Sequence, residues 1–319
     1  MFMRLIPNFK GFDFFPHDLR LPFMRYRDMA MALSVVAMLA SLALIMTRGF
    51  NFGVDFKGGS LIELQATSGN ADITTLREKL HTLGLGEVQI QEFGGPTNVL
   101  IRISEQLGGD AAQQTALKSV IDAVGSGYAQ RRVEVVGPAV SSELRYTGIV
   151  AVAASILAIV TYVWFRFEWQ FAVGAVVALV HDVLVTLGIF SLFQFQFDLS
   201  IVAALLTILG YSVNDTVVVS DRIRENLRKF KKMELNDLLN LSLNETLSRT
   251  ILTSISAIVV LLALYIFGGE VIRNFNLAML IGIVVGTYSS IFIAAPLISY
   301  FGVKRDWSDQ AAKGVAAKA

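Results

Sequence analysis

Six long apolar stretches constrain the fold of this chain more than any other feature of its sequence. Each is close to the roughly 20 residues that an α-helix needs to cross the hydrocarbon core of a membrane. They are Met29–Thr47, Gly148–Phe165, Phe171–Phe193, Leu199–Ser220, Thr250–Phe267 and Leu277–Phe301. Composition agrees, because only 17% of the residues are charged, against about 25% in soluble domains. The sequence therefore predicts an α-helical polytopic membrane protein with six transmembrane helices.

The distribution of Lys and Arg predicts the orientation of these spans, because basic residues concentrate in cytoplasmic connections. They lie in the N-terminal arm, at Arg166, in Arg222–Lys232 and at Lys304 and Arg305, whereas the turns Gln194–Asp198 and Gly268–Asn276 contain only Arg273. We therefore expect both termini in the cytoplasm and the long stretch Arg48–Tyr146 outside. The start of the chain lacks the pattern of a cleaved signal, so we expect the first span to be retained as an anchor.

The outside stretch has the pattern of a small folded domain. Alternating apolar residues and helical spacing indicate the element order β-α-β-β-α-β, which is the ferredoxin-like arrangement. The predicted strands are Ser60–Ala66, Val88–Phe93, Val99–Ile103 and Arg132–Val136, and the predicted helices are Ile73–Leu83 and Ala112–Val124. Its surface carries no catalytic constellation in the sequence.

The domain organisation that follows has seven parts. They are an N-terminal arm (residues 1–28), the first span (29–47), the outside α+β domain (48–146), spans two to four (147–220), a basic loop (221–248), spans five and six (249–301) and a tail (302–319). The basic loop is compatible with a solvated face, contact with anionic membrane lipids or a docking surface.

Several classes of function are excluded or disfavoured. The chain has no cysteine, so disulfides, zinc–thiolate sites and cysteine nucleophiles are excluded. Its three scattered histidines disfavour a histidine-rich metal site. Phosphate-binding loops and the common hydrolase and metalloprotease motifs are missing. We therefore expect no enzymatic activity, no cofactor or metal, and no nucleic-acid partner.

Ionisable side chains inside the predicted spans are the candidate functional residues, since each costs roughly 2.5–3.5 kcal/mol on insertion scales. The fourth span contains Asn214 and Asp215, which we expect on one helical face. The third span contains His181 and Asp182, and the fifth opens with Arg249. These groups can converge in the interior of the bundle, where each lowers the desolvation cost of the others.

A carboxylate that gains and loses a proton beside a cation that tunes its pKa is the minimum requirement for proton coupling. A proton that crosses the membrane releases about 2.3 kcal/mol per 100 mV. The alternative is an inert polar cluster needed only for helix packing, with Arg249 extending to the membrane interface. Both interpretations fit the residues alone.

The sixth span carries small residues every four positions, namely Ala278, Gly282, Gly286, Ser290 and Ala294. Such a stripe lets a second helix approach closely. The second helix can belong to this chain or to a partner.

Several short motifs, in one fixed order, resemble the SecF family of bacterial protein-export subunits. The most characteristic runs from Gly49 to Gly59 and includes Gly53, Asp55, Phe56, Gly58 and Gly59. The others are Val135–Pro138, Phe165–Trp169, Ala178–Asp182, Gly210–Thr216, Ser220–Asn226 and Thr246–Thr250. Each motif is weak alone, but together with six spans and one outside domain they are specific.

The resemblance implies an RND-like half bundle in the bacterial inner membrane, with its outside domain in the periplasm. It implies an accessory of the Sec translocon that works with SecD and uses the proton motive force to assist preprotein translocation. The implied proton-coupling residues are Asp215 and Arg249, while His181 and Asp182 match a further signature. Implied partners are SecD as a separate subunit, the SecYEG translocon, YajC, unfolded preproteins and membrane lipids.

Two alternatives to this function stay open. One is an RND-like exporter of small molecules or lipids, although the outside domain is small for that role. The other is a scaffold for SecD that uses no protons.

Overall fold

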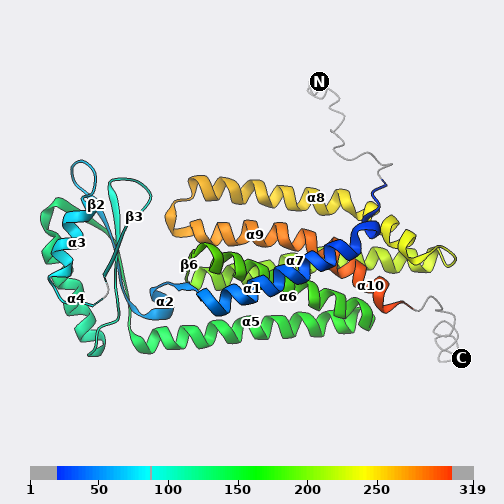
Figure 1. The fold of residues 1–319 in the computed structure, drawn as a ribbon, viewed down its shortest axis with the longest axis horizontal. Helices are drawn as coiled ribbons and strands as arrows, with labels where there is room; N and C mark the ends of the chain where they lie inside the picture. The colour runs from blue at the N-terminus through cyan, green and yellow to red at the C-terminus, as the bar shows by residue number, and fades with distance from the viewer. Residues whose placement is uncertain (1–19, 87, 304–319) are drawn as a thin grey trace, which may run out of the picture.

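The computed structural model describes residues 20–86 and 88–303. Most of the predicted N-terminal arm and of the basic tail, including Lys304 and Arg305, lies outside the described residues. The described chain forms an elongated molecule with a helical bundle at one end and a small α+β domain at the other (Figure 1).

Six helical segments in the described residues are long and apolar enough to span a membrane, which confirms the predicted class of fold. They are α1 (Arg27–Arg48), α5 (Pro138–Arg166), α6 (Trp169–Phe193), α7 (Leu199–Lys229), α8 (Leu235–Phe267) and the continuous rod of α9 (Arg273–Ser289), the π-helical turn η4 (Ser290–Ala294) and α10 (Ala295–Phe301). Short 3₁₀ turns, η1 (Phe23–Tyr26) and η3 (Glu270–Ile272), precede α1 and α9.

The helices are longer than the apolar stretches that predicted them. The predicted basic loop 221–248 consists mostly of the ends of α7 and α8, which are separated only by residues 230–234. The two ends pack together because Leu238, Leu239 and Leu243 are buried beside Leu227. The amide of Asn226 also donates to Ser242 Oγ at 3.0 Å across this helical hairpin.

The outside domain has the predicted β-α-β-β-α-β order. Its strands are β2 (Gly59–Ala66), β3 (Val88–Glu92), β4 (Asn98–Ile103) and β5 (Tyr128–Val136), and its helices are α3 (Ile73–His81), α4 (Gly109–Val124) and the turn η2 (Gly125–Gly127). The sheet order is β3-β4-β2-β5 with every neighbouring pair antiparallel, which is the ferredoxin-like topology. Helices α3 and α4 cover the face turned away from the bundle (Figure 1).

The core of this domain lies between that face and the two helices. Alternate residues of β2 and β4, such as Ile62 and Ile101, are fully buried there with Leu76, Leu80 and Val120. Side chains of the opposite face point towards the bundle, because successive strand residues alternate between faces.

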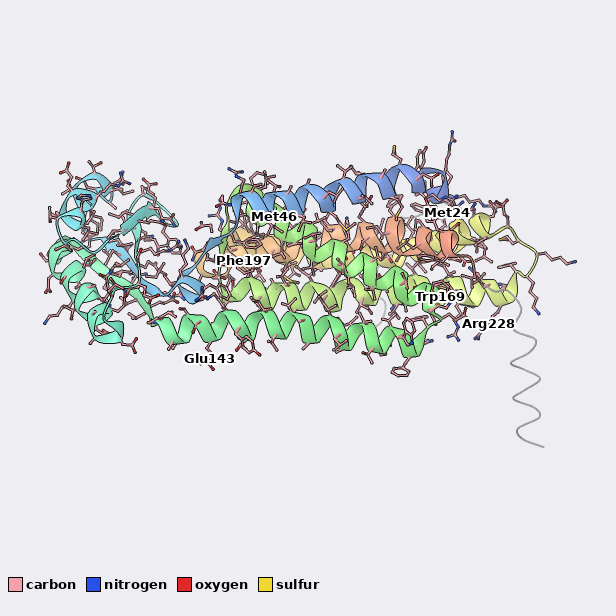
Figure 2. The ribbon with its side chains drawn as sticks, turned by 60° about the horizontal axis from the view of Figure 1, so that its bottom comes forward. Met24, Met46, Glu143, Trp169, Phe197 and Arg228 are labelled. Carbon is pink, nitrogen blue, oxygen red and sulfur yellow. The ribbon has the colours of Figure 1, made fainter. Side chains whose placement is uncertain are left out.

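A short junction connects the two parts of the molecule. Strand β1 (Asn51–Phe52) pairs in parallel with β6 (Gln196–Phe197), and the one-turn helix α2 (Val54–Lys57) leads from β1 into β2. Figure 2 shows Phe197 at this junction, with Trp169 and Arg228 at the opposite end of the bundle. The sequence pattern does not predict these short elements.

Candidate functional site

Asp215 lies on α7 in the interior of the bundle and is only 4% exposed. Among the residues that the structure describes, its Oδ2 atom has no hydrogen-bond partner, and the hydroxyls of Tyr211, Thr216 and Thr250 are likewise buried without one. Most buried polar atoms in proteins are paired, so this group of unpaired atoms on α7 and α8 is unusual. It leaves the carboxyl of Asp215 an open position for a proton.

Arg249 on α8 supplies the positive charge that acts on Asp215. The two side chains form no ion pair within 4.0 Å among the described residues, and Arg249 is exposed on the surface of the isolated chain. Thr253 Oγ1 donates to the Arg249 carbonyl at 3.0 Å. The attraction therefore acts over a distance and does not lock the carboxylate in a direct salt bridge.

Asn214 does not share the buried face of Asp215, contrary to the expectation from spacing. Asn214 is exposed whereas Asp215 is buried. Consecutive helical residues point about 100° apart, so the border between the buried and the exposed face falls between them.

His181 and Asp182 on α6 form a second buried cluster. His181 Nδ1 lies 3.0 Å from Asp182 Oδ1, and Asp182 Oδ2 accepts hydrogen bonds from Ser212 Oγ at 2.5 Å and from Ser289 Oγ at 2.8 Å. Asp182 is fully buried and His181 is 2% exposed. The carboxyl thus joins α6 to both α7 and α9.

The two clusters are separate, although both include residues of α7. Ser212, which donates to Asp182, precedes Asp215 by three residues on the helix. Through Ser212 the His–Asp pair contacts the helix that carries Asp215. Convergence of Asp215, Arg249 and the His–Asp pair stays a prediction. Ser289 was missed by sequence reasoning, although it adjoins Ser290 in the small-residue stripe.

The stripe on the sixth span faces other helices of this chain. A Cβ atom on Gly282 would lie 2.3 Å from Ile208 Cδ1, and one on Gly286 would lie 3.1 Å from Ser212 Cβ. Ser290 is fully buried and donates to the Thr287 carbonyl at 3.0 Å. The absence of side chains at the two glycines therefore lets α9 approach α7 closely.

The residues of the Gly49–Gly59 motif gather at the junction. The Gly53 amide donates to the Phe197 carbonyl at 2.8 Å, and Asp55 Oδ2 accepts from the Leu199 amide at 2.8 Å. Phe56 is buried in the bundle core. The paired glycines Gly58 and Gly59 are buried where α2 enters β2.

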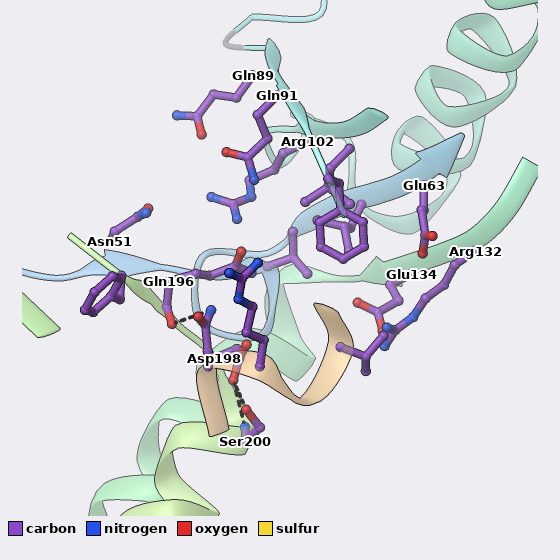
Figure 3. Close-up of a pocket in the computed structure, with 18 of the residues that line it drawn as sticks. Asn51, Glu63, Gln89, Gln91, Arg102, Arg132, Glu134, Gln196, Asp198 and Ser200 are labelled. Atoms are coloured by element: carbon purple, nitrogen blue, oxygen red, sulfur yellow. Dashed lines mark hydrogen bonds and ion pairs between the residues drawn. The ribbon is translucent and has the colours of Figure 1, made fainter. Parts of the chain in front are cut away.

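A polar cleft of about 510 Å³ opens beside the junction, between the uncovered sheet face and the outer end of the bundle (Figure 3). Its walls include Gln91 and Arg102 from the sheet and Gln196 and Asp198 from the bundle. Burial raises the pKa of Asp198, and the negative charge of Asp55 raises it further, while hydrogen bonds from Ser200 oppose the shift. No group of three potential metal ligands occurs in the described ranges.

Family comparisons place most of this chain in one group of membrane proteins. A family model described as "Protein export membrane protein SecD/SecF, C-terminal" matches residues 116–304, and a second, "SecD/SecF GG Motif", matches residues 43–69. The second match covers the junction motif described above.

Curated relatives agree over nearly the whole chain. Protein translocase subunit SecF of Cereibacter sphaeroides is 45% identical over 302 residues, which cover 91% of this chain and 92% of the relative. The same subunit of Rickettsia rickettsii is 44% identical, with 94% of each chain covered. Protein translocase subunit SecDF of Brucella abortus is 45% identical over 91% of this chain, but this chain spans only 38% of that longer relative.

Solved structures show the same fold. The crystal structure of SecDF from Thermus thermophilus matches with a TM-score of 0.80 and 36% identity, covering 90% of this chain and 39% of that chain. A crystal structure of SecDF in a super-membrane-facing form matches with a TM-score of 0.65 and 35% identity, covering 95% and 40% respectively.

Proposed function

The chain belongs to the SecD/SecF family of protein export membrane proteins, and on this premise we propose that it couples the proton motive force to the export of proteins. It is an accessory membrane subunit of the Sec protein translocase, as its SecF relatives are named. The proposed energy source is the proton gradient, with no catalytic activity and no cofactor in this chain. The preprotein is the proposed substrate.

The observation that carries the proposal is the carboxyl of Asp215. It is buried in a membrane-spanning helix, and one of its oxygens has no hydrogen-bond partner in the described part of the chain. A structural carboxylate at such a depth is usually paired, because burying an unpaired charge is costly. A group that binds a proton from one side and releases it to the other needs an open position of this kind. Arg249 supports the charged form after release.

We propose that the His181–Asp182 pair assists proton binding and release at Asp215 and is not itself the group that binds the transported proton. Both oxygens of Asp182 already have hydrogen-bond partners. The pair is therefore suited to transmitting a change at Asp215 from α7 to α6 and α9, since Ser212 stands one turn from Asp215. Asn214, which is exposed on α7, is assigned only a contact with a partner helix or lipid.

The proposed partner is SecD, because the SecDF relatives contain a match to this chain within a longer polypeptide. SecYEG, YajC and membrane lipids are proposed as further neighbours. We place the chain in the bacterial inner membrane with both termini in the cytoplasm, because the basic ends of α5 and α7 lie at the end of the bundle far from the outside domain (Figure 1).

The test is proton-gradient-dependent export of a preprotein in membrane vesicles that contain the complete translocase. Asp215→Asn keeps the shape of the side chain and removes its titratable charge. We expect the gradient-stimulated part of export to disappear while insertion and assembly stay normal. The matched control is Asp221→Asn, which changes an exposed carboxylate on the same helix that pairs with Arg166. This control should export as the wild type does.

Unchanged gradient stimulation in Asp215→Asn would contradict the proposal and favour a scaffold for SecD that uses no protons. An exporter of small molecules or lipids would instead show gradient-dependent transport in vesicles that lack preprotein.

A further inference from the structure

We propose that Asp55 latches the outside domain to the outer end of α7, so that a movement of the helix that carries Asp215 displaces the outside domain. The inference extends the proposed function, because it names the contact that would transmit the effect of protonation. It gives a role to the Gly49–Gly59 motif, which the proposed proton coupling does not involve.

Helix α7 is long and continuous. This helix runs without interruption from Leu199 to Lys229. About 24 Å of helix separates its first residue from Asp215 at a rise of 1.5 Å per residue. An unbroken helix is stiff over such a length, so a shift or tilt at Asp215 also moves the N-terminal turn of α7.

Two carboxylates bind the N-terminal turn of α7. Asp55 Oδ2 accepts a hydrogen bond from the Leu199 amide at 2.8 Å, across 144 residues of sequence. The first amides of a helix have no partner within the helix, and a carboxylate interacts favourably with them. Asp198 caps the same turn by accepting from the Ser200 amide at 3.0 Å. Two carboxylates, Asp55 from the junction helix α2 and Asp198 from the bundle, thus share one helix end.

Neighbouring side chains of α2 point into different cores. Val54 packs with Leu61 and Leu100 on the bundle-facing side of the sheet. Phe56 packs in the bundle core with Phe197 and Val202. Asp55 stands between them in the sequence. Helix α2 is therefore an adapter, with one residue in the outside domain, one in the bundle and one on the end of α7.

The connection from α2 into the sheet is tightly packed. Gly59 has a φ of +111°, and a Cβ atom there would lie 2.3 Å from the Ile103 carbonyl oxygen of the adjacent strand. Only glycine fits this close approach. Only Gly58 lies between the end of α2 at Lys57 and the start of β2 at Gly59, so the connection from the adapter to the sheet is one residue long. A displacement of α2 reaches β2 directly.

The covalent links do not replace this latch. The domain is also tethered through β5, which continues into α5 at Pro138. Helix α5 is mostly exposed, with 11% of its apolar window buried, and it does not carry the proposed proton site. It can therefore act as a pivot that keeps the domain attached when the contact of Asp55 is removed.

The experiment measures the distance between the two parts by electron paramagnetic resonance in the full chain, reconstituted with its translocase partners. The chain has no cysteine, so Lys118→Cys on α4 and Val271→Cys on η3 place spin labels with no competing thiol in this chain. Both positions are exposed. Distances are recorded at rest and under a proton gradient, in the wild type and in Asp55→Ala, Asp55→Asn and Asp72→Ala.

We expect Asp55→Ala to broaden the resting distance distribution and to abolish its shift under the gradient. Asp55→Asn should restore a narrow resting distribution, because its carbonyl oxygen can still accept from the Leu199 amide. The matched control is Asp72→Ala, which removes a helix-capping carboxylate that accepts from the Thr75 amide on α3. This variant should behave as the wild type does.

A resting distribution in Asp55→Ala as narrow as that of the wild type would overturn the latch. The two proposals fail in different ways. If the wild type shows no shift under the gradient, proton coupling to domain movement is wrong, and the resting distributions still decide whether Asp55 holds the domain. If the wild type shifts and Asp55→Ala shifts equally, the latch alone is wrong.

Discussion

Two buried carboxyl groups, Asp182 on α6 and Asp215 on α7, have surroundings that differ at the level of single atoms. Asp182 accepts two hydroxyl hydrogen bonds and contacts His181, whereas Oδ2 of Asp215 has no hydrogen-bond partner within residues 20–86 and 88–303. A satisfied buried network makes a structure rigid, while an unsatisfied group marks a place where the chemistry can change. This difference supports a holding role for Asp182 and the titrating role that we propose for Asp215.

The holding role of Asp182 predicts a loss of stability when its carboxyl is removed. Asp182→Ala leaves the hydroxyls of Ser212 and Ser289 without their acceptor, and an orphaned buried donor costs about 1–3 kcal/mol. We expect a lower thermal unfolding temperature in detergent, measured by intrinsic fluorescence. Asp182→Asn retains an acceptor oxygen and should recover most of the loss.

The control for this prediction is Ser289→Ala. Ser289 Oγ also contacts the Gly286 carbonyl at 3.1 Å, and its removal leaves Asp182 with Ser212 and His181. Its effect should therefore be smaller than that of Asp182→Ala. Equal stability of Asp182→Ala and the wild type would show that the buried network contributes little.

At the scale of elements, close packing of α9 on α7 brings Ser289 and Ser212 to the same carboxyl. Gly282 and Gly286 leave room for the side chains of Ile208 and Ser212. Membrane helices associate through such small-residue surfaces, because lipid gives no hydrophobic drive for helix pairing. The geometry of the candidate site therefore depends on the stripe of the sixth span.

This packing predicts that Gly282→Ala destabilises the bundle. The new methyl group would lie within 2.3–2.8 Å of three atoms of Ile208, and overpacking of a tight interior costs typically 1–3 kcal/mol. The double variant Gly282→Ala with Ile208→Ala should unfold at a higher temperature than the sum of the single effects predicts. Thermal unfolding of the four proteins of this cycle measures the coupling.

Gly210→Ala on α7 is the matched control, because a Cβ atom there meets nothing within 4 Å. Alanine is favoured over glycine in helices by about 1 kcal/mol, so this variant should be as stable as the wild type or more so. Simple additivity between Gly282→Ala and Ile208→Ala would show that α9 does not rest on Ile208.

The elements also show what the sequence could and could not predict. The strands of the outside domain and the six spans follow from periodicity and length, so their order was predicted. The start of α8 at Leu235 was not, because polar residues such as Asn236 and Asn240 lower its hydropathy while Leu238 and Leu239 are buried. The two-residue strands β1 and β6 are too short to carry a period.

Single contacts between distant residues were the least predictable part of the site. Asp215 and the His181–Asp182 pair stood out because ionisable groups are rare in apolar stretches. Two serines that donate to Asp182 lie 30 and 107 residues away, and the backbone amide that donates to Asp55 lies 144 residues away. Serine and backbone amides carry no distinctive signal, so only the fold brings them together.

For the whole molecule, the exposed apolar faces of α1, α5 and α8 agree with a bundle surrounded by lipid or a partner. Only 11–17% of the apolar windows of these three helices is buried, against 50–56% for α6, α7 and the sixth span. At about 46 Å, α7 is longer than the roughly 30 Å hydrocarbon core. The helix therefore extends beyond the hydrocarbon core, and its basic end, which includes Arg228, lies at the end of the bundle far from the outside domain (Figure 2).

This arrangement predicts opposite accessibility for the two ends of the molecule. Lys118→Cys lies on the outside domain and Lys231→Cys lies between α7 and α8, and both positions are exposed. In cells with a permeabilised outer membrane, a membrane-impermeant thiol reagent should label Lys118→Cys, and it should reach Lys231→Cys only after the inner membrane is opened. The wild type has no cysteine and sets the background. The reverse pattern would contradict the orientation, since the basic hairpin would then lie on the side that basic connections avoid.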